Sequence, residues 1–232
     1  VILAFFQTNG PKSRIFVGLG NFSFIFQDPD FHKALLNTTI YTLFAVCLQL
    51  PISLALALLL NSAKSKLKAL FRLIIFSPHL VGAIFVGILF SVLFTPRYGM
   101  INRFLYNLTG FGLEQRWLSN PSLVMPALVL TSLWMYAGFN MIYFLAALQG
   151  VDQNLIDASR VDGANFWQTF RHVTLPAIKP VMTFVVIMSI IGSYQLFELP
   201  LTLLVDGHGP DNAGYTIRSE ERRVGKECAT GC

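Results

Sequence analysis

Polar side chains interrupt two long apolar stretches of this 232-residue sequence. Asn140 and Tyr143 lie three residues apart in the first stretch. Tyr194, Gln195 and Glu198 fall within about one and a half helical turns in the second. Their amide, carboxyl, hydroxyl and ring groups suit a solute rich in hydroxyl groups, but they could instead hydrogen bond between helices and hold a bundle together. Because polar groups at membrane depth face a bundle interior or a cavity, the candidates for a solute path are Asn140, Tyr143, Ser189, Tyr194, Gln195 and Glu198.

A polar segment between the two stretches predicts two short helices joined at a glycine. Asp152 can cap the first helix, and Gly163 can end it in the left-handed conformation. Asn165 can cap the second helix, and Leu175-Pro176 is expected to close it. Small side chains gather on the exposed turn and let another protein approach closely: Ala158, Ser159, Gly163 and Ala164. The alternative interpretation is an ordinary connector between two membrane spans.

Residue types that carry catalysis or bind metals are scattered along the chain. No set of His, Cys, Asp and Glu has metal-ligand spacing. A phosphate-binding loop of the G-x-x-x-x-G-K-S/T type is absent, and no serine lies in a nucleophile motif. His79, beside Pro78, is interpreted as a polar tip at a membrane interface rather than as a ligand. The sequence therefore gives no support for an enzyme.

The composition indicates a chain that lipid must solvate in part. Hydrophobic residues make up 54% and charged residues 12% of the sequence, whereas soluble domains carry about 25% charged residues. The mean hydropathy of +0.58 excludes disorder as well as a water-facing globule. The net charge of +5 could indicate a nucleic-acid partner, but no basic stripe with stacking aromatic residues is present. No nucleic-acid partner is expected.

Charge-free apolar runs locate the membrane spans, because a helix needs about 20 apolar residues to cross the hydrocarbon core. Four spans are predicted, at residues 37–60, 73–95, 123–148 and 180–204. Pro78 is expected to kink the second span or to set its start. Apolar residues at helical spacing between Gly99 and Gly110 predict a short amphipathic helix.

Lysine and arginine residues orient the spans. The turn from 61 to 72 carries four basic residues and no acid, which indicates a cytoplasmic location. Residues 9–33 and 96–120 are then expected outside the membrane, and residues 150–179 inside.

The segment between the third and fourth spans carries four short motifs. In chain order they are Asp157-Ala158-Ser159, Asp162-Gly163-Ala164, Phe170 and Val173-Thr174-Leu175-Pro176. This segment resembles the EAA loop of permease subunits of binding-protein-dependent ABC importers, with Asp157 in place of glutamate and Ser159 in place of alanine. Residues 195–200 and 207–210 resemble further segments of the carbohydrate-type branch of that family. The resemblance covers roughly residues 5 to 217.

The resemblance implies an all-α polytopic membrane protein, a helical bundle like that of type I ABC importers, in the inner membrane of a bacterium. It implies that residues 152–176 form a coupling loop, with the contacts made by Asp157, Ala158, Ser159, Asp162, Gly163, Ala164, Phe170, Leu175 and Pro176. The expected partners are a second permease subunit, an ABC ATPase dimer, an extracellular or periplasmic solute-binding protein and the lipid bilayer. ATP and magnesium would bind to the ATPase, so this chain is expected to be no enzyme and to hold no cofactor.

The expected cargo is a sugar, an oligosaccharide or a polyol. The alternatives are an ABC permease for another solute, a secondary carrier that uses Glu198 as its intramembrane acid, and an anchoring subunit without a solute path. Residues 1–217 are expected to form the permease domain, apparently truncated at both ends. Residues 1–8 look like the last turns of an earlier span, and the polar residues 218–232 are expected to lie outside the native fold, where relatives have a further span.

Overall fold

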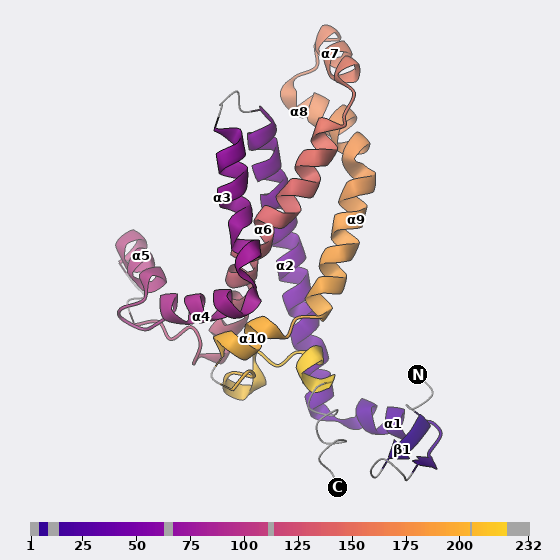
Figure 1. Cartoon of the computed structure of the whole chain (residues 1–232), viewed down its shortest axis with the longest axis vertical. Coiled ribbons are helices and arrows are strands. Elements are labelled where there is room, and N and C mark those ends of the chain that lie inside the picture. Colours follow the sequence, from indigo (N-terminus) through magenta and orange to yellow (C-terminus); the bar gives the residue numbers. More distant parts are fainter. Residues whose placement is uncertain (1–4, 9–13, 63–66, 111–113, 205, 222–232) are drawn as a thin grey trace. The chain divides into compact units, whose positions relative to one another are not determined.

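Helices dominate the computed structural model, which describes residues 5–8, 14–62, 67–110, 114–204 and 206–221 (Figure 1). The longer helices are α2 (Pro29–Ser62), α3 (Lys68–Val81), α4 (Ala83–Leu93), α6 (Pro121–Gln149) and α9 (Leu175–Tyr194). The shorter ones are α1 (Gly20–Gln27), α5 (Met100–Thr109), α7 (Gln153–Val161), α8 (Phe166–Thr169) and α10 (Glu198–Leu203). A π-helix covers Phe170–Thr174, and a 3-10 helix covers Pro210–Asn212.

A small β-hairpin precedes the helices. Strand β1 (Phe6–Thr8) pairs antiparallel with β2 (Arg14–Phe16), and Phe6 is opposite Phe16. The rings of these two residues lie 5.3 Å apart, an edge contact that favours the pairing. The expectation of helical turns over residues 1–8 is therefore wrong for residues 6–8, and residues 1–4 lie outside the described part of the chain.

Several helices are long and apolar enough to cross a membrane. Within the described residues these are Pro29–Ser62, Pro121–Gln149 and the continuous helix Phe166–Tyr194. The 34 residues of α2 extend over about 50 Å at 1.5 Å per residue, more than a hydrocarbon core requires. Helices α3 and α4 pass the same test together, but they are bent by 98° where they meet.

The break between α3 and α4 lies at Gly82, not at Pro78. Pro78 is inside α3, whereas Gly82 has a φ of +87°. A residue with a side chain rarely adopts this φ, so the glycine permits the sharp change of direction. The expectation that Pro78 kinks or starts the second span is wrong.

The helix that follows Asn165 does not close at Leu175-Pro176. The backbone N–H of Leu175 bonds the carbonyl of Phe170, five residues back, and the helix continues to Tyr194. Such a wide π-turn adds a residue to the helix and separates the carbonyls that a proline would otherwise meet. The expected closure is wrong because the π-turn accommodates Pro176.

The predicted fourth span, 180–204, is divided in the structure. Helix α9 ends at Tyr194, and α10 begins at Glu198. Residues 217–221 are helical, and residues 222–232 of the predicted non-native tail lie outside the described residues. The span and domain boundaries remain predictions.

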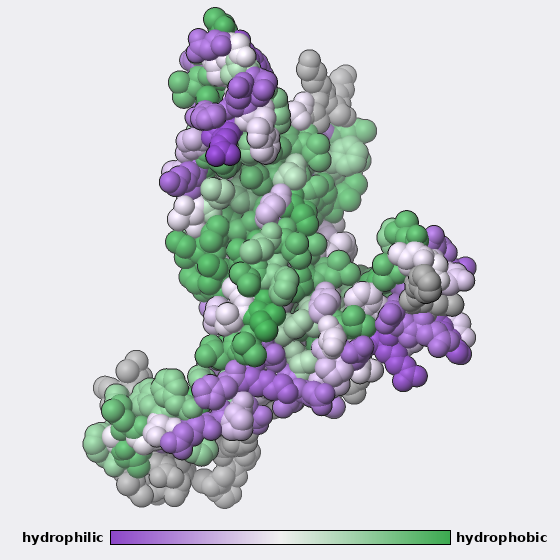
Figure 2. All heavy atoms as spheres, turned by 180° about the vertical axis from the view of Figure 1, so that it is seen from behind, coloured by the Kyte–Doolittle hydropathy of each residue, from purple (hydrophilic) through white to green (hydrophobic). Residues whose placement is uncertain are grey.

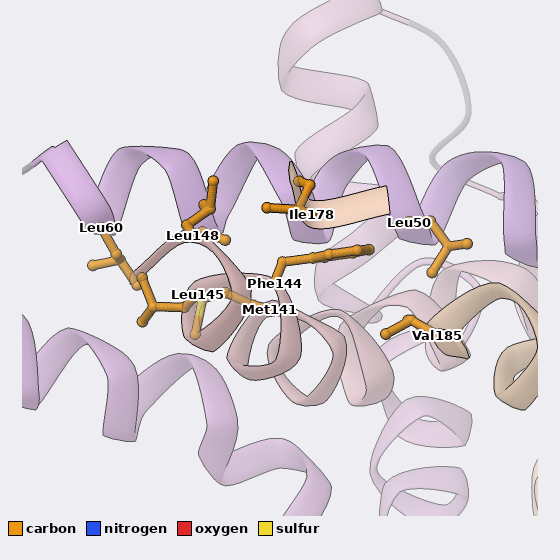
Figure 3. Close-up of a cluster of buried hydrophobic side chains, with 9 residues drawn as sticks. Leu50, Leu60, Met141, Phe144, Leu145, Leu148, Ile178 and Val185 are labelled. Carbon is orange, nitrogen blue, oxygen red and sulfur yellow. The ribbon is translucent and has the colours of Figure 1, made fainter. Parts of the chain in front are cut away.

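Residues 43–86 and 129–192 form one compact unit. Its core consists of side chains from α2, α6 and α9: Leu50, Ala57, Leu60, Met141, Phe144, Leu145, Leu148, Ile178 and Val185 (Figure 3). In the same unit α3 lies directly against α6, because a Cβ atom at Gly138 would overlap the carbonyl oxygen of Ile75.

The other unit contains the described parts of residues 1–42, 87–128 and 193–232. Asn37 of α2 donates from Nδ2 to the carbonyls of Asn212, at 2.8 Å, and Tyr215, at 3.1 Å. Gly87 of α4 packs against Thr202 of α10 so closely that a Cβ atom would overlap the threonine side chain. These contacts hold α2, α4, α10 and the residues after α10 together in one unit.

Candidate functional site

The segment 152–174, here called the α7–α8 knob, begins with a capped helix. The Asp152 carboxylate accepts the backbone N–H of Asn154 at 2.9 Å, which satisfies one of the free N–H groups at the start of α7. The predicted cap is confirmed. It fixes where the chain turns from α6 into the knob.

Gly163 ends α7 as predicted. Its φ of +80° is left-handed, and the N–H of Gly163 bonds the carbonyl of Arg160 at 3.1 Å. The next N–H, of Ala164, bonds the carbonyl of Ser159 at 2.9 Å. These two bonds form a Schellman motif. A Cβ atom at Gly163 would meet no atom within 4 Å, so the backbone conformation rather than crowding requires glycine here.

Helix α8 starts with a complete capping box. Asn165 Oδ1 accepts the N–H of Gln168 at 2.9 Å, and Gln168 Oε1 accepts the N–H of Asn165 at 2.8 Å. This reciprocal pair satisfies two backbone donors at once. The predicted cap at Asn165 is confirmed, and both ends of the Gly163 turn are therefore fixed by local bonds.

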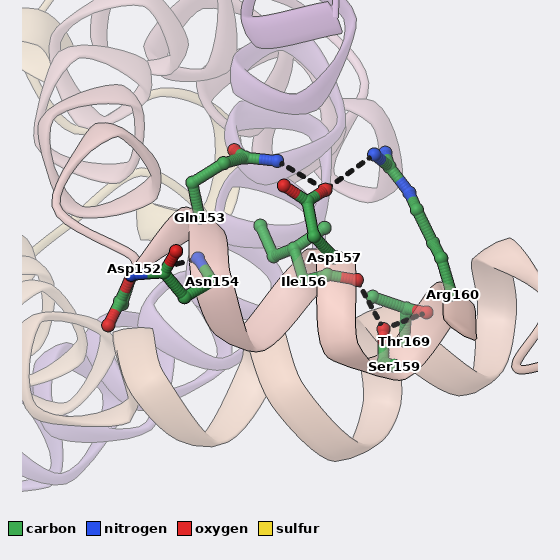
Figure 4. A network of polar contacts seen from close by, with 8 residues as sticks. All are labelled: Asp152, Gln153, Asn154, Ile156, Asp157, Ser159, Arg160 and Thr169. Carbon is green, nitrogen blue, oxygen red and sulfur yellow. Dashed lines mark hydrogen bonds and ion pairs between the residues drawn. The ribbon is translucent and has the colours of Figure 1, made fainter. Parts of the chain in front are cut away.

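A hydroxyl pair connects the two helices. Ser159 Oγ donates to the carbonyl of Ile156 at 2.7 Å and lies 3.0 Å from Thr169 Oγ1 (Figure 4). On the exposed side of α7, Asp157 Oδ1 accepts from Gln153 Nε2 and from Arg160 Nη1, both at 3.1 Å. An exposed pair of this kind contributes at most about 1 kcal/mol, so Asp157 is available for a partner.

A shallow hollow of about 350 Å³ opens between α7, α8 and the π-helix. Three of the four small residues predicted for the turn line it, namely Ser159, Gly163 and Ala164. The rest of the lining is Asp162, Gln168, Thr169, His172 and Val173. Ala158 is exposed on α7 outside this lining, and Phe170 is half-buried. Leu175 and Pro176 belong to α9.

Large apolar side chains are exposed on the knob. Val161, Phe166 and Trp167 are 89%, 74% and 65% exposed, and the Trp167 ring stacks on Phe170 at 5.5 Å. Figure 2 shows hydrophilic side chains gathered over this knob and apolar ones along the other helices of the same unit. The sequence analysis did not single out Val161 or Trp167. The signal that could have found them is an apolar residue close to a helix cap or a turn.

Part of the predicted solute path lies on one face of α6. Tyr136, Phe139, Asn140 and Tyr143 recur at helical spacing, and the Tyr143 ring lies 5.2 Å from Phe139. Asn140 is only 5% exposed. Within the described residues its amide makes no hydrogen bond, and its amide atoms are not sealed from the surface, because the sealed and unpaired side-chain atoms there belong to Arg72, His79 and His208. Ser189, on α9 in the same unit, does have a partner.

His79 packs among aromatic rings of α3 and α6. Its ring stacks on Phe139 at 4.3 Å and lies 5.5 Å from Tyr136 and 6.0 Å from Phe76. Its Nδ1 atom is buried and unpaired among the described residues. The ring of His79 thus belongs to an aromatic cluster of α3 and α6, and its interpretation as a polar tip at a membrane interface stays a prediction.

The other predicted path residues lie at the break between α9 and α10. The Tyr194 hydroxyl lies 3.2 Å from Thr39 Oγ1. The Gln195 and Glu198 side chains are exposed, and the Glu198 carbonyl accepts the Thr202 hydroxyl at 2.8 Å. Glu198 is therefore not the buried acid that an intramembrane proton relay would need.

Comparison with known proteins identifies the family. A family profile described as "Binding-protein-dependent transport system inner membrane component" matches residues 22–219. The arabinooligosaccharides transport system permease protein AraP of Bacillus subtilis (strain 168) is 37% identical over 218 residues, which cover 94% of this chain and 68% of that protein. The lactose transport system permease protein LacF of Rhizobium radiobacter is 34% identical over 217 residues, covering 94% of this chain and 72% of that protein.

A solved structure shares the fold. It is a bacterial alginate ABC transporter in complex with alginate pentasaccharide-bound periplasmic protein. One chain of it superimposes with a TM-score of 0.80 at 25% identity, covering 92% of this chain and 74% of that chain.

These matches confirm the expected helical permease fold and the multi-pass location in the inner membrane. They also confirm a transport subunit without a cofactor rather than an enzyme, and they exclude the secondary carrier and the anchoring subunit. The chain belongs to the family of inner membrane components of binding-protein-dependent transport systems, the permeases of ABC transporters.

Proposed function

We propose that this permease carries a sugar or an oligosaccharide into the cell and that the α7–α8 knob couples its spans to ATP hydrolysis. The knob docks on an ABC ATPase dimer, and a second permease subunit completes the passage. A periplasmic binding protein delivers the solute.

The observation that carries the coupling role is the continuity between the knob and a span. The helix runs without a break from Phe166 to Tyr194, so α8 and α9 are joined through the π-turn rather than by a loop. A displacement of α8 by a partner therefore moves α9 with it. The capping box and the Schellman motif keep α7 and the Gly163 turn in a fixed relation to α8, so the knob moves as one body.

The surface of the knob fits a protein partner. Val161, Phe166 and Trp167 expose apolar side chains in a segment that the charge distribution assigns to the cytoplasm. Exposed apolar groups with aromatic members are typical of binding surfaces. The hollow beside Gly163 and Ala164 leaves room for a protruding side chain of the ATPase, and the exposed carboxylate of Asp157 favours a basic partner residue.

The α6 face is the part of the solute path that geometry supports best. Asn140 presents an unpaired amide from a buried position, and Tyr143 and Phe139 present aromatic rings beside it. A sugar supplies hydroxyl groups for the amide and C–H faces for the rings. Ser189, which belongs to the same unit, is proposed as a further residue of the solute path. Tyr194, Gln195 and Glu198 are proposed on their sequence spacing alone.

The solute class rests on the relatives as well as on these residues. AraP is named as a permease for arabinooligosaccharides and LacF as one for lactose, and both match 94% of this chain. The polar and aromatic character of the α6 face agrees with a saccharide. We infer an oligosaccharide as the cargo.

Reconstitution tests this function. The permease is expressed with its neighbouring ATPase and second permease, and ATP hydrolysis in proteoliposomes is measured with the binding protein added empty or loaded from a saccharide library. Saccharide-loaded binding protein should stimulate hydrolysis several-fold over the empty form. If only a non-sugar ligand stimulates hydrolysis, the solute assignment is wrong and the coupling role stands. If no ATPase copurifies, the coupling role is wrong.

A further inference from the structure

Helix α5 exposes an apolar stripe that no described residue covers. Met100, Phe104 and Leu108 follow one another at intervals of four residues and are 70%, 63% and 66% exposed. Gly99 precedes the helix, and Gly110 ends it with a left-handed φ of +73°. The predicted short amphipathic helix is thereby confirmed, and its exposed face needs a partner.

A buried asparagine holds α5 in place. Asn102 is fully buried and donates from Nδ2 to the carbonyl of Gln115 at 2.8 Å, while its Oδ1 accepts from Trp117 Nε1 at 2.6 Å. The Trp117 ring in turn lies 5.4 Å from Phe94, at the end of α4. Phe104 lies about 160° around the helix from Asn102. The bonds of Asn102 therefore turn the apolar stripe away from the residues that hold the helix.

The flank of the stripe is polar and basic. Arg103 follows it along one side of α5 and is exposed. Arg97 is neutralised by Glu114 through a 2.6 Å ion pair, but Arg103 has no ion pair in the described part of the chain. This flank therefore carries net positive charge next to the apolar side chains, which complements an anionic surface.

The stripe is too small for a stable protein interface. A large aromatic side chain such as Phe104 buries about 150–250 Å², and three such residues fall short of the about 800 Å² that each partner usually contributes. A lipid surface needs no such area, and an apolar face with a basic flank is typical of helices that lie in it. On α4, which ends six residues before α5, Ile88, Leu89 and Val92 are exposed as well, so apolar side chains are exposed on both of these helices.

We propose that α5 lies along the membrane surface, with Met100, Phe104 and Leu108 at the boundary between headgroups and acyl chains and Arg103 against lipid phosphate. By the lysine and arginine distribution this is the outer leaflet. Helix α5 and the hydrogen bonds of Asn102 then hold the residues between α4 and α6 at a fixed depth in the membrane surface. The anchor is independent of the solute that the permease carries.

Spin-label accessibility tests the proposal on the whole transporter in nanodiscs of phosphatidylethanolamine and phosphatidylglycerol. With the native cysteines replaced by serine, nitroxides are attached at Phe104→Cys and, as a control on the same helix, at Tyr106→Cys, which is 46% exposed and lies about 160° around the helix from Phe104. Collisions with oxygen, which enters lipid, are compared with collisions with a water-soluble nickel chelate. The oxygen-to-nickel ratio should be at least about threefold higher at residue 104 than at residue 106.

Equal ratios at the two positions would overturn the proposal. It would also be wrong if residue 104 became shielded from nickel only after the binding protein is added, because a protein would then be the partner. Labels at Met100→Cys and Leu108→Cys repeat the measurement if the first variant does not assemble with the ATPase. The ratio does not depend on transport or on which leaflet is involved, so a failure of the proposed function leaves this test intact.

Discussion

The hydroxyl oxygens of Ser159 and Thr169 lie 3.0 Å apart, and this hydrogen bond joins α7 to α8 across the Gly163 turn. Thr169 is buried, so its hydroxyl has little access to water. The residue that departs from the family's alanine, Ser159, thus connects the two helices of the knob. The contribution of this hydrogen bond to the stability of the knob can be measured separately from the effect of the space that a small side chain leaves for a partner.

Ser159→Ala should loosen the knob without blocking the partner. A neutral hydrogen bond contributes about 1 kcal/mol, so amide exchange over residues 153–169 should quicken about fivefold, while the ATPase still copurifies. Thr183→Ala is the control, because its exposed hydroxyl bonds only the Lys179 carbonyl of its own helix, at 3.0 Å. Unchanged exchange in Ser159→Ala would show that the pair does not stabilise the knob.

Gly163→Leu should abolish ATPase copurification, whereas Gly163→Asn should retain most of it. A branched side chain at a φ of +80° costs about 1–2 kcal/mol, but asparagine tolerates the left-handed region. Both side chains have room in the isolated chain. If both variants lose the ATPase, the ATPase requires the empty space beside Gly163 rather than the left-handed turn. If both keep it, the coupling assignment is wrong.

Gly138→Ala should lower the thermal stability of the purified complex. A methyl group there would overlap the Ile75 carbonyl, and forcing α3 from α6 costs about 1–3 kcal/mol. Gly192→Ala on α9 is the matched control, because no atom lies within 4 Å of its added Cβ. The control should melt at or above the wild-type temperature. Equal melting of the two variants would contradict the close approach of α3 and α6.

Asn140→Leu should reduce uptake while leaving thermal stability unchanged or slightly raised. Because the Asn140 amide bonds no described residue, replacing it with an apolar group of similar volume breaks no hydrogen bond within that part of the chain. If Asn140 instead held helices together through an interhelical bond, the substitution would destabilise the complex. Melting temperature and uptake of a labelled oligosaccharide, measured on the same preparation, distinguish the two roles.

Impermeant maleimide should label only one of three single cysteines in intact cells. Asn61→Cys and Gln168→Cys are expected in the cytoplasm, and Asn107→Cys is expected outside. All three positions are exposed, so a lack of reaction reports sidedness rather than burial. After permeabilisation all three should react. Labelling of Asn61→Cys before permeabilisation would reverse the orientation derived from the basic residues.

The knob was largely predictable because its signals are local. A cap bonds a backbone N–H two or three residues on, as Asp152 and Asn165 do, and the left-handed turn at Gly163 follows from the freedom of glycine itself. The roles of Val161 and Trp167 were not predictable, because exposure depends on how α7 and α8 pack. The bend at Gly82 was missed because proline is the stronger local signal.

The amino-acid sequence by itself determined that this chain crosses a membrane, where its apolar runs lie and which segment forms the capped knob, because these follow from composition and from neighbours within one or two helical turns. Only the tertiary structure decided that the helix passes through Pro176, that α3 lies against Gly138 and that Asn140 is buried. Each of these depends on a π-turn or on a contact between helices far apart in the sequence. Residue types along a single helix do not specify such contacts, since the same pattern suits lipid, another helix or a solute.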